Sequence, residues 1–333
     1  MNNTAERLSA GASVGNLLGK YWLAILTVAT YLVLAALAPS FRTFSNLMTI
    51  LISACVICIS GLGLTCILST GELDFGAGTE LAAGTVIYGL ILGYTPIKSI
   101  WLALLITIAF MAVYGALNAF LHIKLKIPAF IATFALSYLL KGAGQIVMTK
   151  VCKGYTTLYN QRGWPDDFGF FGQSYIGPIP VAVIALIVVC ALVFMYTEGT
   201  KWGRYLYAVG ANPRACDYLG INSNFQKFLG FVLCAVLCGL AGVLQASMTK
   251  TSTITCGDSA LMSGLSVMMI GATFLKPGVF NVAGTIVGAL LVAMLNNGLV
   301  IVGLTQWLRD LISALILLAA IVMVVVFKHR ASK

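Results

Sequence analysis

Charged residues are scarce in this sequence. Lys and Arg account for 20 positions and Asp and Glu for 10, which is 9% of 333 residues. An ordinary soluble domain carries roughly 25%. Apolar residues make up 60%, which excludes disorder, and no stretch is long and polar enough to be a separate soluble domain. Long continuous apolar runs also disfavour a membrane β-barrel, whose strands alternate apolar and polar residues.

Catalytic motifs are equally scarce. The chain contains only two His residues, His122 and His329, so the zinc motif H-E-x-x-H is absent. No phosphate-binding G-x-x-x-x-G-K-[ST] occurs, and no G-x-S-x-G. Both His residues stand beside Lys or Arg at predicted cytoplasmic helix ends, where a solvated or topological role is expected. The sequence therefore predicts a protein that is not an enzyme and has no metal site.

The nine Cys residues do not form the framework of a secreted disulfide protein. Most of them lie inside apolar runs, where Cys acts as a small packing residue. Only Cys152 and Cys256 fall in predicted extracytoplasmic loops, and a bridge between these two stays open. Cys55 with Cys58 and Cys234 with Cys238 have metal-like spacing, but neither pair has a second pair or a His nearby, so packing is the prediction.

The apolar runs predict an all-α, polytopic membrane protein with about ten transmembrane helices, because each crossing needs about 20 apolar residues. The first run is interpreted as an uncleaved span, since Pro39 follows its A-x-A sequence. We treat 1–333 as a single transmembrane domain with a cytoplasmic tail at 1–20. The predicted spans are approximately 21–38, 48–68, 78–94, 100–121, 128–148, 179–196, 227–247, 260–275, 281–300 and 306–327.

The basic residues predict the orientation of these spans. An even number of spans puts both termini on one side of the membrane. With the termini inside, the cytoplasmic loops hold twice as many Lys and Arg residues as the outer loops, in keeping with the positive-inside rule. Both termini are therefore predicted to be cytoplasmic. The net charge of +10 is explained by this topology, and nucleic-acid binding is not expected.

Two predicted loops are long. The extracytoplasmic loop 149–178 is rich in Tyr, Trp and Phe, which is typical either of an interfacial aromatic belt or of a docking surface for an outside partner. The cytoplasmic loop 197–226 is polar and contains Gly and Pro. Within it, Asn212, Pro213 and Gly220 predict a short helix over about 213–219, with an N-cap, a proline at N1 and a glycine C-cap.

A few polar residues are candidates for a translocation path. Glu72 and Asp74 lie in GELDFGAG (71–78), which is either a helix break lining a polar cavity or an ordinary cytoplasmic turn. Glu80 begins a span, where an acid is favourable to the helix dipole. Asn296 and Asn297 lie within a span and either face a cavity or hydrogen-bond between helices.

Four segments in order resemble one family. GELDFGAG (71–78), IPAFIATFALSYLLKG (127–142), GRYLYAVGANPRACDYLGIN (203–222) and the block 264–303, which contains L-N-N-G-L, are similar to motifs of ribose-permease-like membrane subunits of bacterial sugar ABC importers. The sequence departs from the family pattern at Cys216 and at Lys276-Pro277. In the first motif, Phe75, Gly76 and Ala77 stand where the family has an aliphatic residue, Ser and Val, so the hydroxyl is missing at Gly76.

The resemblance implies a permease subunit that translocates a monosaccharide or related small polar solute across the bacterial inner membrane. Such subunits pair as homodimers or with a close relative, and they receive solute from an extracytoplasmic binding protein. Two cytoplasmic ATPase domains use ATP and Mg, and the permease binds no cofactor itself. The alternative is an ion- or proton-coupled secondary transporter that uses Glu72, Asp74 or Glu80.

The polar residues described above, Glu72, Asp74, Asn296 and Asn297, are the candidates for the translocation path. The resemblance implies that the loop matching 203–222 docks into the ATPase. The expected ATPase-coupling residues, all within the cytoplasmic loop 197–226, are Gly203, Arg204, Gly210, Asn212, Arg214, Gly220 and Ile221.

Overall fold

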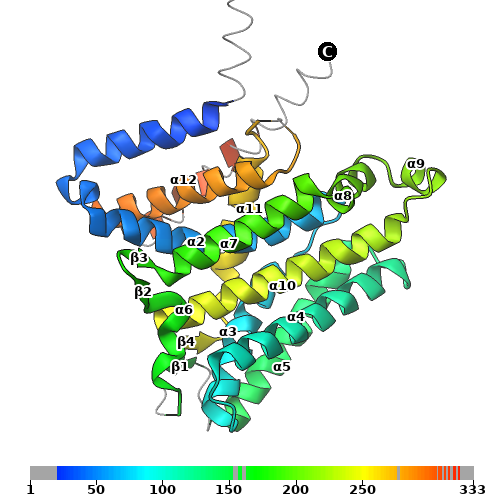
Figure 1. Ribbon diagram of the computed structural model, residues 1–333, viewed down its shortest axis with the longest axis horizontal. Helices are drawn as coiled ribbons and strands as arrows, with labels where there is room; N and C mark the ends of the chain where they lie inside the picture. Colours follow the sequence, from blue (N-terminus) through cyan, green and yellow to red (C-terminus); the bar gives the residue numbers. More distant parts are fainter. Residues whose placement is uncertain are drawn as a thin grey trace, which may run out of the picture. The chain divides into compact units, whose positions relative to one another are not determined.

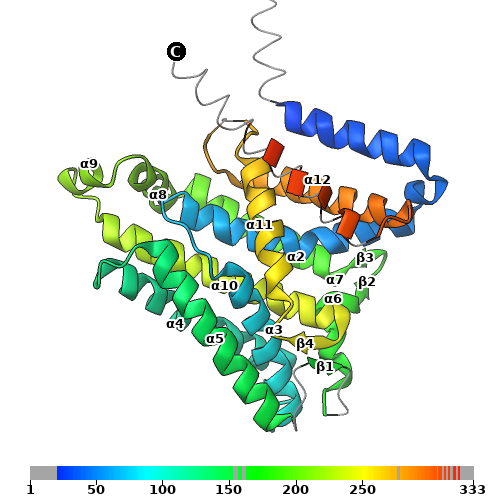
Figure 2. The same cartoon turned by 180° about the vertical axis from the view of Figure 1, so that it is seen from behind.

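The computed structural model (Figures 1 and 2) describes residues 21–152, 157–159, 163–275 and 278–305, with isolated positions between 307 and 322. The predicted tail at 1–20, Lys276, Pro277 and much of the predicted span at 306–327 lie outside the described residues. The chain divides into two compact units, one of residues 51–265 and one of residues 1–50 with 266–333. Each unit is described by itself.

The described residues are overwhelmingly helical, which confirms the all-α prediction. The helices are α2 (Phe44–Leu68), α3 (Ala77–Tyr94), α4 (Ile100–Ile123), α5 (Ala129–Val151), α6 (Phe170–Gln173), α7 (Val181–Phe194), α8 (Lys201–Ala211), α9 (Pro213–Tyr218), α10 (Ser223–Thr249), α11 (Gly257–Gly271) and α12 (Val282–Ile301). A further apolar helix covers Tyr21–Leu37. The shorter elements are η1 (Pro39–Arg42), η2 (Asp166–Gly169), the π-helical η3 (Met195–Gly199), β1 (Thr157–Tyr159), β2 (Tyr175–Ile176), β3 (Ile179–Pro180) and β4 (Thr251–Thr253).

Six helical segments among the described residues are long and apolar enough to cross a membrane. They are α2, α4, α5, α7 continued by η3 (Val181–Gly199), α10 and α12. The helix Tyr21–Leu37 and α11 are shorter, and α3, which carries Glu80, is not among the six. The protein is thus a multi-pass membrane protein, while the total of about ten spans and the cytoplasmic termini stay predictions.

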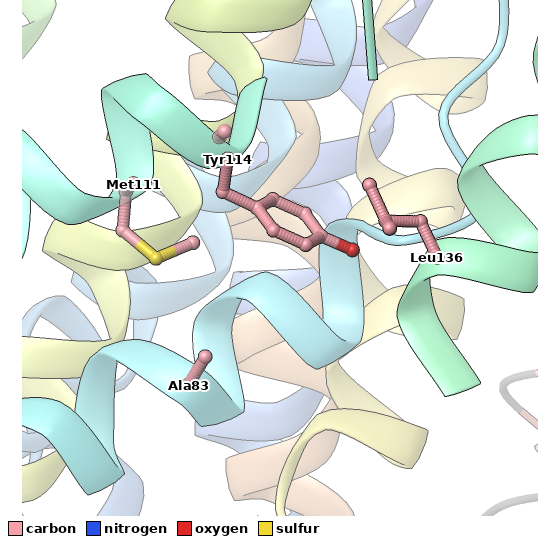
Figure 3. Packing of buried hydrophobic residues seen from close by; sticks show 5 residues of the cluster. Ala83, Met111, Tyr114 and Leu136 are labelled. Carbon is pink, nitrogen blue, oxygen red and sulfur yellow. The ribbon is translucent and has the colours of Figure 1, made fainter. Parts of the chain in front are cut away.

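Helix α10 is the centre of the unit formed by residues 51–265. It packs most extensively against α4 and α3, and α3 also packs against α5. Small residues permit this approach: a Cβ atom placed on Gly84 of α3 would lie only 2.4 Å from the carbonyl oxygen of Gly239 in α10. Beside this crossing, Tyr114 of α4 lies between Ala83 of α3 and Leu136 of α5 in a buried apolar cluster (Figure 3).

The predicted loop 149–178 folds back onto the helices at one end of this unit. Strand β1 pairs antiparallel with β4, and Trp164 stacks on Phe168 with ring centroids 3.9 Å apart. The Trp164 indole also donates a hydrogen bond to the carbonyl of Gly89 at 2.9 Å. Trp164, Phe168 and Phe171 are buried, so these three rings are core residues, and the interpretation of the whole aromatic set as a membrane belt or docking surface is wrong for them.

The other end of the same unit carries α8 and α9, away from the strands and α6 (Figures 1 and 2). The loops predicted to be cytoplasmic and those predicted to be extracytoplasmic therefore gather at opposite ends of the unit.

The unit of residues 1–50 and 266–333 contains the helix Tyr21–Leu37, η1, the end of α11 and α12. Asn281 begins α12: its side-chain oxygen accepts a hydrogen bond from the Gly284 N–H at 2.7 Å, and its amide donates to the Phe274 carbonyl at 3.0 Å. The Trp22 indole donates to the Thr273 carbonyl at 3.3 Å. A side chain at Gly284 would collide with the Gly271 carbonyl, so the turn between α11 and α12 brings two backbones into direct contact.

The cysteines are all free thiols. Cys152 is buried at the end of α5 and Cys256 precedes α11, and the bridge between them that the sequence left open is not formed. Six of the other seven cysteines are buried, as packing residues would be, and Cys190 is half-buried. The Cys234 and Cys238 thiols also lie within 4.8 Å of a Glu80 carboxylate oxygen.

Candidate functional site

The GELDFGAG segment is a tightly packed break between α2 and α3. Gly71 ends α2 in the left-handed region, with φ +84°, and its N–H donates to the Leu68 carbonyl at 2.9 Å. The Asp74 carboxylate then accepts a hydrogen bond from the Gly76 N–H at 2.7 Å, and the Phe75 N–H donates to the Thr133 hydroxyl of α5 at 3.1 Å. Asp74 is 0% exposed, so the segment is not an ordinary solvated turn.

Glu72 connects the ends of three helical elements. Its Oε1 lies 2.6 Å from Nζ of Lys227, in the second turn of α10, and 3.2 Å from Nε2 of His122, at the end of α4. The other ring nitrogen of His122, Nδ1, lies 2.9 Å from the Ile127 carbonyl oxygen. Because both ring nitrogens face acceptors, the geometry fits a doubly protonated ring. Of the two roles expected for His122, the solvated one is therefore wrong, while the topological one stays a prediction.

This cluster keeps Glu72 ionised. Burial by itself would raise the pKa of the Glu72 carboxyl, but the hydrogen bonds and charges of His122 and Lys227 outweigh burial, and the pKa is lowered from its ordinary 4.5. The three side chains are each less than one-fifth exposed. They hold the break after α2 against the ends of α4 and α10.

A cavity of about 320 Å³ lies within the unit of residues 51–265, at the lower end of the size range of small-molecule sites. It is bounded by one face of α2, one face of α11 and the C-terminal part of α10. Six hydroxyl or amide residues line it, and the described lining contains no charged side chain. These polar residues are Ser53, Ser60, Gln245, Thr249, Ser259 and Ser263.

The sequence-predicted path residues are not part of this lining. Glu72 and Asp74 lie in the break described above, and Asn296 and Asn297 lie on α12 in the other unit. The side-chain oxygen of Asn297 is buried and accepts no hydrogen bond from any described residue.

The helix predicted in the cytoplasmic loop is present as α9. The Asn212 side chain accepts a hydrogen bond from the Ala215 N–H at 3.0 Å, Pro213 is the first helical residue, and Gly220 adopts φ +77° after the helix. The Ile221 N–H donates to the Cys216 carbonyl at 2.9 Å, closing the turn. Asp217 then accepts hydrogen bonds from both the N–H and the hydroxyl of Ser223, which fixes α9 to the start of α10.

The tip of α9 is apolar and exposed. Tyr218 is 92% exposed and Leu219 is 78% exposed, while Arg204 and Arg214 are exposed along the same segment. These are the two highest exposed fractions among the large apolar residues that the structure describes, and contiguous exposed apolar surface marks interaction sites.

The glycines of α8 pack closely against neighbouring backbone. A Cβ atom on Gly203 would lie 2.1 Å from the Thr197 carbonyl oxygen, and one on Gly210 would lie 2.2 Å from the Ser69 carbonyl oxygen. Both positions therefore lie where α8 touches neighbouring backbone, at the π-helical η3 and at the end of α2. Their contacts explain the need for glycine by internal packing.

Sequence reasoning missed several of these residues. The cavity serines recur at helical spacing, Ser53 with Ser60 and Ser259 with Ser263, and this periodicity was an available signal. Tyr218 and Leu219 stand directly before the predicted C-cap Gly220. Their place at the end of a short capped helix was the signal that their side chains are exposed. No local signal connects Lys227 with Glu72, because the residues come from separate helices.

Comparison with known proteins supports one family over most of the chain. Residues 46–321 match the family described as branched-chain amino acid transport system, permease component. The ribose import permease protein RbsC of Escherichia coli K12 is 29% identical over 87% of this chain and 88% of that protein. The probable ABC transporter permease protein YphD of the same organism is 26% identical over 93% and 91%.

A third relative is the autoinducer 2 import system permease protein LsrC of Klebsiella pneumoniae, 28% identical over 89% of this chain and 83% of that protein. No solved structure matches. The names of these relatives favour an ABC importer permease over the proton-coupled secondary transporter.

Proposed function

Because this chain belongs to the family of branched-chain amino acid transport system permease components, we propose that it is the membrane subunit of a bacterial ABC importer for a small uncharged solute. It works in the inner membrane with both termini in the cytoplasm. Two such subunits, identical or closely related, form the translocation unit. Partner ATPase subunits hydrolyse ATP with Mg, and an extracytoplasmic binding protein delivers the solute.

The α8–α9 segment carries this proposal. Helix α9 is short, its caps are fixed, and its tip is apolar and exposed. Two exposed Arg residues lie along the same segment. Together these features form a compact surface to which a partner subunit can bind. Arg204 and Arg214 supply charge, and Asn212, Gly220 and Ile221 hold the shape of the element. Gly203 and Gly210 contribute by seating α8 against the rest of the unit, so that movement of α9 is transmitted to α2.

Removal of the apolar tip tests the docking role. Burying one Tyr or Leu side chain contributes about 1.5–3 kcal/mol, so the double variant Tyr218→Ser, Leu219→Ser should reduce capture of the ATPase subunit at least about tenfold. Tyr175→Ser is the matched control, because Tyr175 is also well exposed but lies at the opposite end of the unit. Equal capture by wild type and double variant, with the control unchanged, would remove α9 from the interface.

The cavity supports a sugar rather than an amino acid as the solute. A free amino acid carries two opposite charges, and burial of a charge without a partner costs several kcal/mol. The hydroxyl and amide groups of the described lining suit a neutral polyol. The ribose import permease among the relatives is named for a monosaccharide, and a monosaccharide is the solute that we propose for this chain.

Filling the cavity tests this assignment. Ser263→Leu places a bulky apolar side chain in the cavity, and Ser263→Ala removes only the hydroxyl. ATP-dependent uptake of labelled monosaccharide into vesicles should fall at least about tenfold in the Leu variant, with ATPase capture intact, and much less in the Ala variant. Undiminished uptake in the Leu variant would place the path elsewhere.

The four path residues predicted from the sequence divide into two roles in this proposal. Glu72 and Asp74 shape the break between α2 and α3 instead of touching solute, which their ion pairs and backbone hydrogen bonds support. Asn296 and Asn297 remain candidates for solute contact. The side-chain oxygen of Asn297 is buried and accepts no hydrogen bond from any described residue, so it is free to accept one from a solute.

A further inference from the structure

Two carboxyl groups are buried side by side at the start of α3. Asp74 and Glu80 are both 0% exposed and lie close enough to interact electrostatically. One oxygen of each is satisfied: Asp74 Oδ1 by the Gly76 N–H at 2.7 Å, and Glu80 Oε1 by the Asn118 amide at 3.3 Å. The remaining oxygens, Asp74 Oδ2 and Glu80 Oε2, receive no N–H or hydroxyl donor from the described residues.

The groups around the pair do not neutralise it. Helix α4 contributes Tyr114 and Asn118, α10 contributes the thiols of Cys234 and Cys238, and the Cys66 thiol of α2 lies next to Cys238. Helix α5 contributes Thr133, which is bonded to the backbone beside Asp74. In the described part of the chain, no Lys, Arg or His forms an ion pair with either carboxyl group.

Two negative charges in this position would be strongly unfavourable. Two adjacent carboxylates in a site of low dielectric cannot both ionise, so the proton affinity of one of them rises. An unsatisfied buried oxygen costs further free energy. A single proton between Oδ2 and Oε2 removes both problems, because it cancels one charge and turns the two orphaned acceptors into one donor and one acceptor.

We propose that Asp74 and Glu80 share one proton and form a proton-binding site that fastens the GELDFGAG break to the first turn of α3. Burial raises the pKa of the Asp74 carboxyl, which agrees with a bound proton near neutral pH. The site is separate from the solute cavity lining and from α9, so it is a structural element whose existence does not depend on the transported solute.

Infrared spectroscopy of the purified protein tests the sharing directly. Wild type should show the carbonyl stretch of a protonated carboxylic acid that is shielded from solvent exchange. Glu80→Gln and Asp74→Asn each keep the shape of the side chain and supply an amide N–H to the remaining carboxylate, so both variants should fold and both should lose the band. Asp258→Asn, at an exposed carboxylate, is the control and should keep it.

Each other result overturns the proposal. A band that persists in Asp74→Asn means that Glu80 is protonated by burial alone, and a band that persists in Glu80→Gln means the same of Asp74. A wild-type protein without the band has no shared proton. Stoichiometric metal in the purified protein, lost in Glu80→Gln, would mean that a cation satisfies these oxygens, since Glu80 also lies within ligand distance of Cys234 and Cys238.

The pH dependence of stability gives a second readout. A carboxyl pair that holds its proton in the folded state stabilises the protein fully below the unfolded pKa, and this stabilisation is lost as pH rises through the folded pKa. The melting temperature of wild type should therefore fall toward alkaline pH more steeply than that of Glu80→Gln. Parallel curves for the two proteins would contradict the shared proton, whatever the result of the transport and ATPase assays.

Discussion

Replacing Gly210 by Ala should loosen α8 from the end of α2. The added Cβ atom would lie 2.2 Å from the Ser69 carbonyl oxygen and 3.2 Å from the Gly71 nitrogen. Both contacts are with backbone, which cannot rotate away. Overpacking of this kind costs about 1–3 kcal/mol, and the better helix propensity of Ala returns at most about 1 kcal/mol.

Gly142→Ala is the matched control for this substitution. Gly142 also lies in a helix, α5, but a Cβ atom there would meet nothing within 4 Å. The control should therefore be neutral or slightly stabilising, and the two variants should differ by about 1–3 kcal/mol in the free energy of unfolding. Each kcal/mol shifts the melting temperature of a domain of 150–250 residues by about 2–4 °C.

The assay is thermal unfolding of the detergent-purified protein, followed by capture of the ATPase subunit. Gly210→Ala should melt several degrees below Gly142→Ala, and it should capture less ATPase because α9 follows α8. Equal melting temperatures for the two variants would refute the packing argument and return Gly210 to the docking surface. A lower melting temperature with normal ATPase capture would refute only the mechanical connection between α8 and α9.

Further predictions concern the other clusters. Glu72→Gln should lower the melting temperature at pH 7, because it breaks a mostly buried ion cluster. The contribution of ionised Glu72 to the stability of wild type should be present above its ordinary pKa of 4.5 and should disappear as pH falls through the lowered folded pKa. The melting temperatures of the two proteins should therefore converge in acid. A difference in melting temperature that stays constant with pH would contradict the role of ionisation. Trp164→Phe keeps a ring for stacking but loses the hydrogen bond to the Gly89 carbonyl, and it should cost about 1–3 kcal/mol in thermal unfolding, whereas no loss would mean that water replaces the donor.

Features set by neighbouring residues were predictable from the sequence. The start and end of α9 follow from the Asn212 side chain, the ring of Pro213 and the left-handed Gly220, all within one short stretch. The break at GELDFGAG was likewise predictable, because Gly71 can adopt φ +84°. Apolar run lengths gave most of the described helices, with boundaries a few residues different.

Features set by distant residues were not predictable. The cluster of Glu72, His122 and Lys227 joins three separate elements, and no local pattern shows that they meet. The burial of Trp164 depends on the space left by Gly89 and Gly93 on α3. The spacing of seven between Gly203 and Gly210 places both glycines on one face of a helix, but this spacing alone does not show which backbone packs against that face.

The measurement that tests the central claim most directly is solute uptake into proteoliposomes. We predict that labelled monosaccharide accumulates only when the ATPase subunit, ATP, Mg and the extracytoplasmic binding protein are all present, and that the double variant Tyr218→Ser, Leu219→Ser abolishes this uptake. Uptake that is driven by a proton or sodium gradient, without ATPase subunit or nucleotide, would contradict the assignment of this chain as an ABC importer permease.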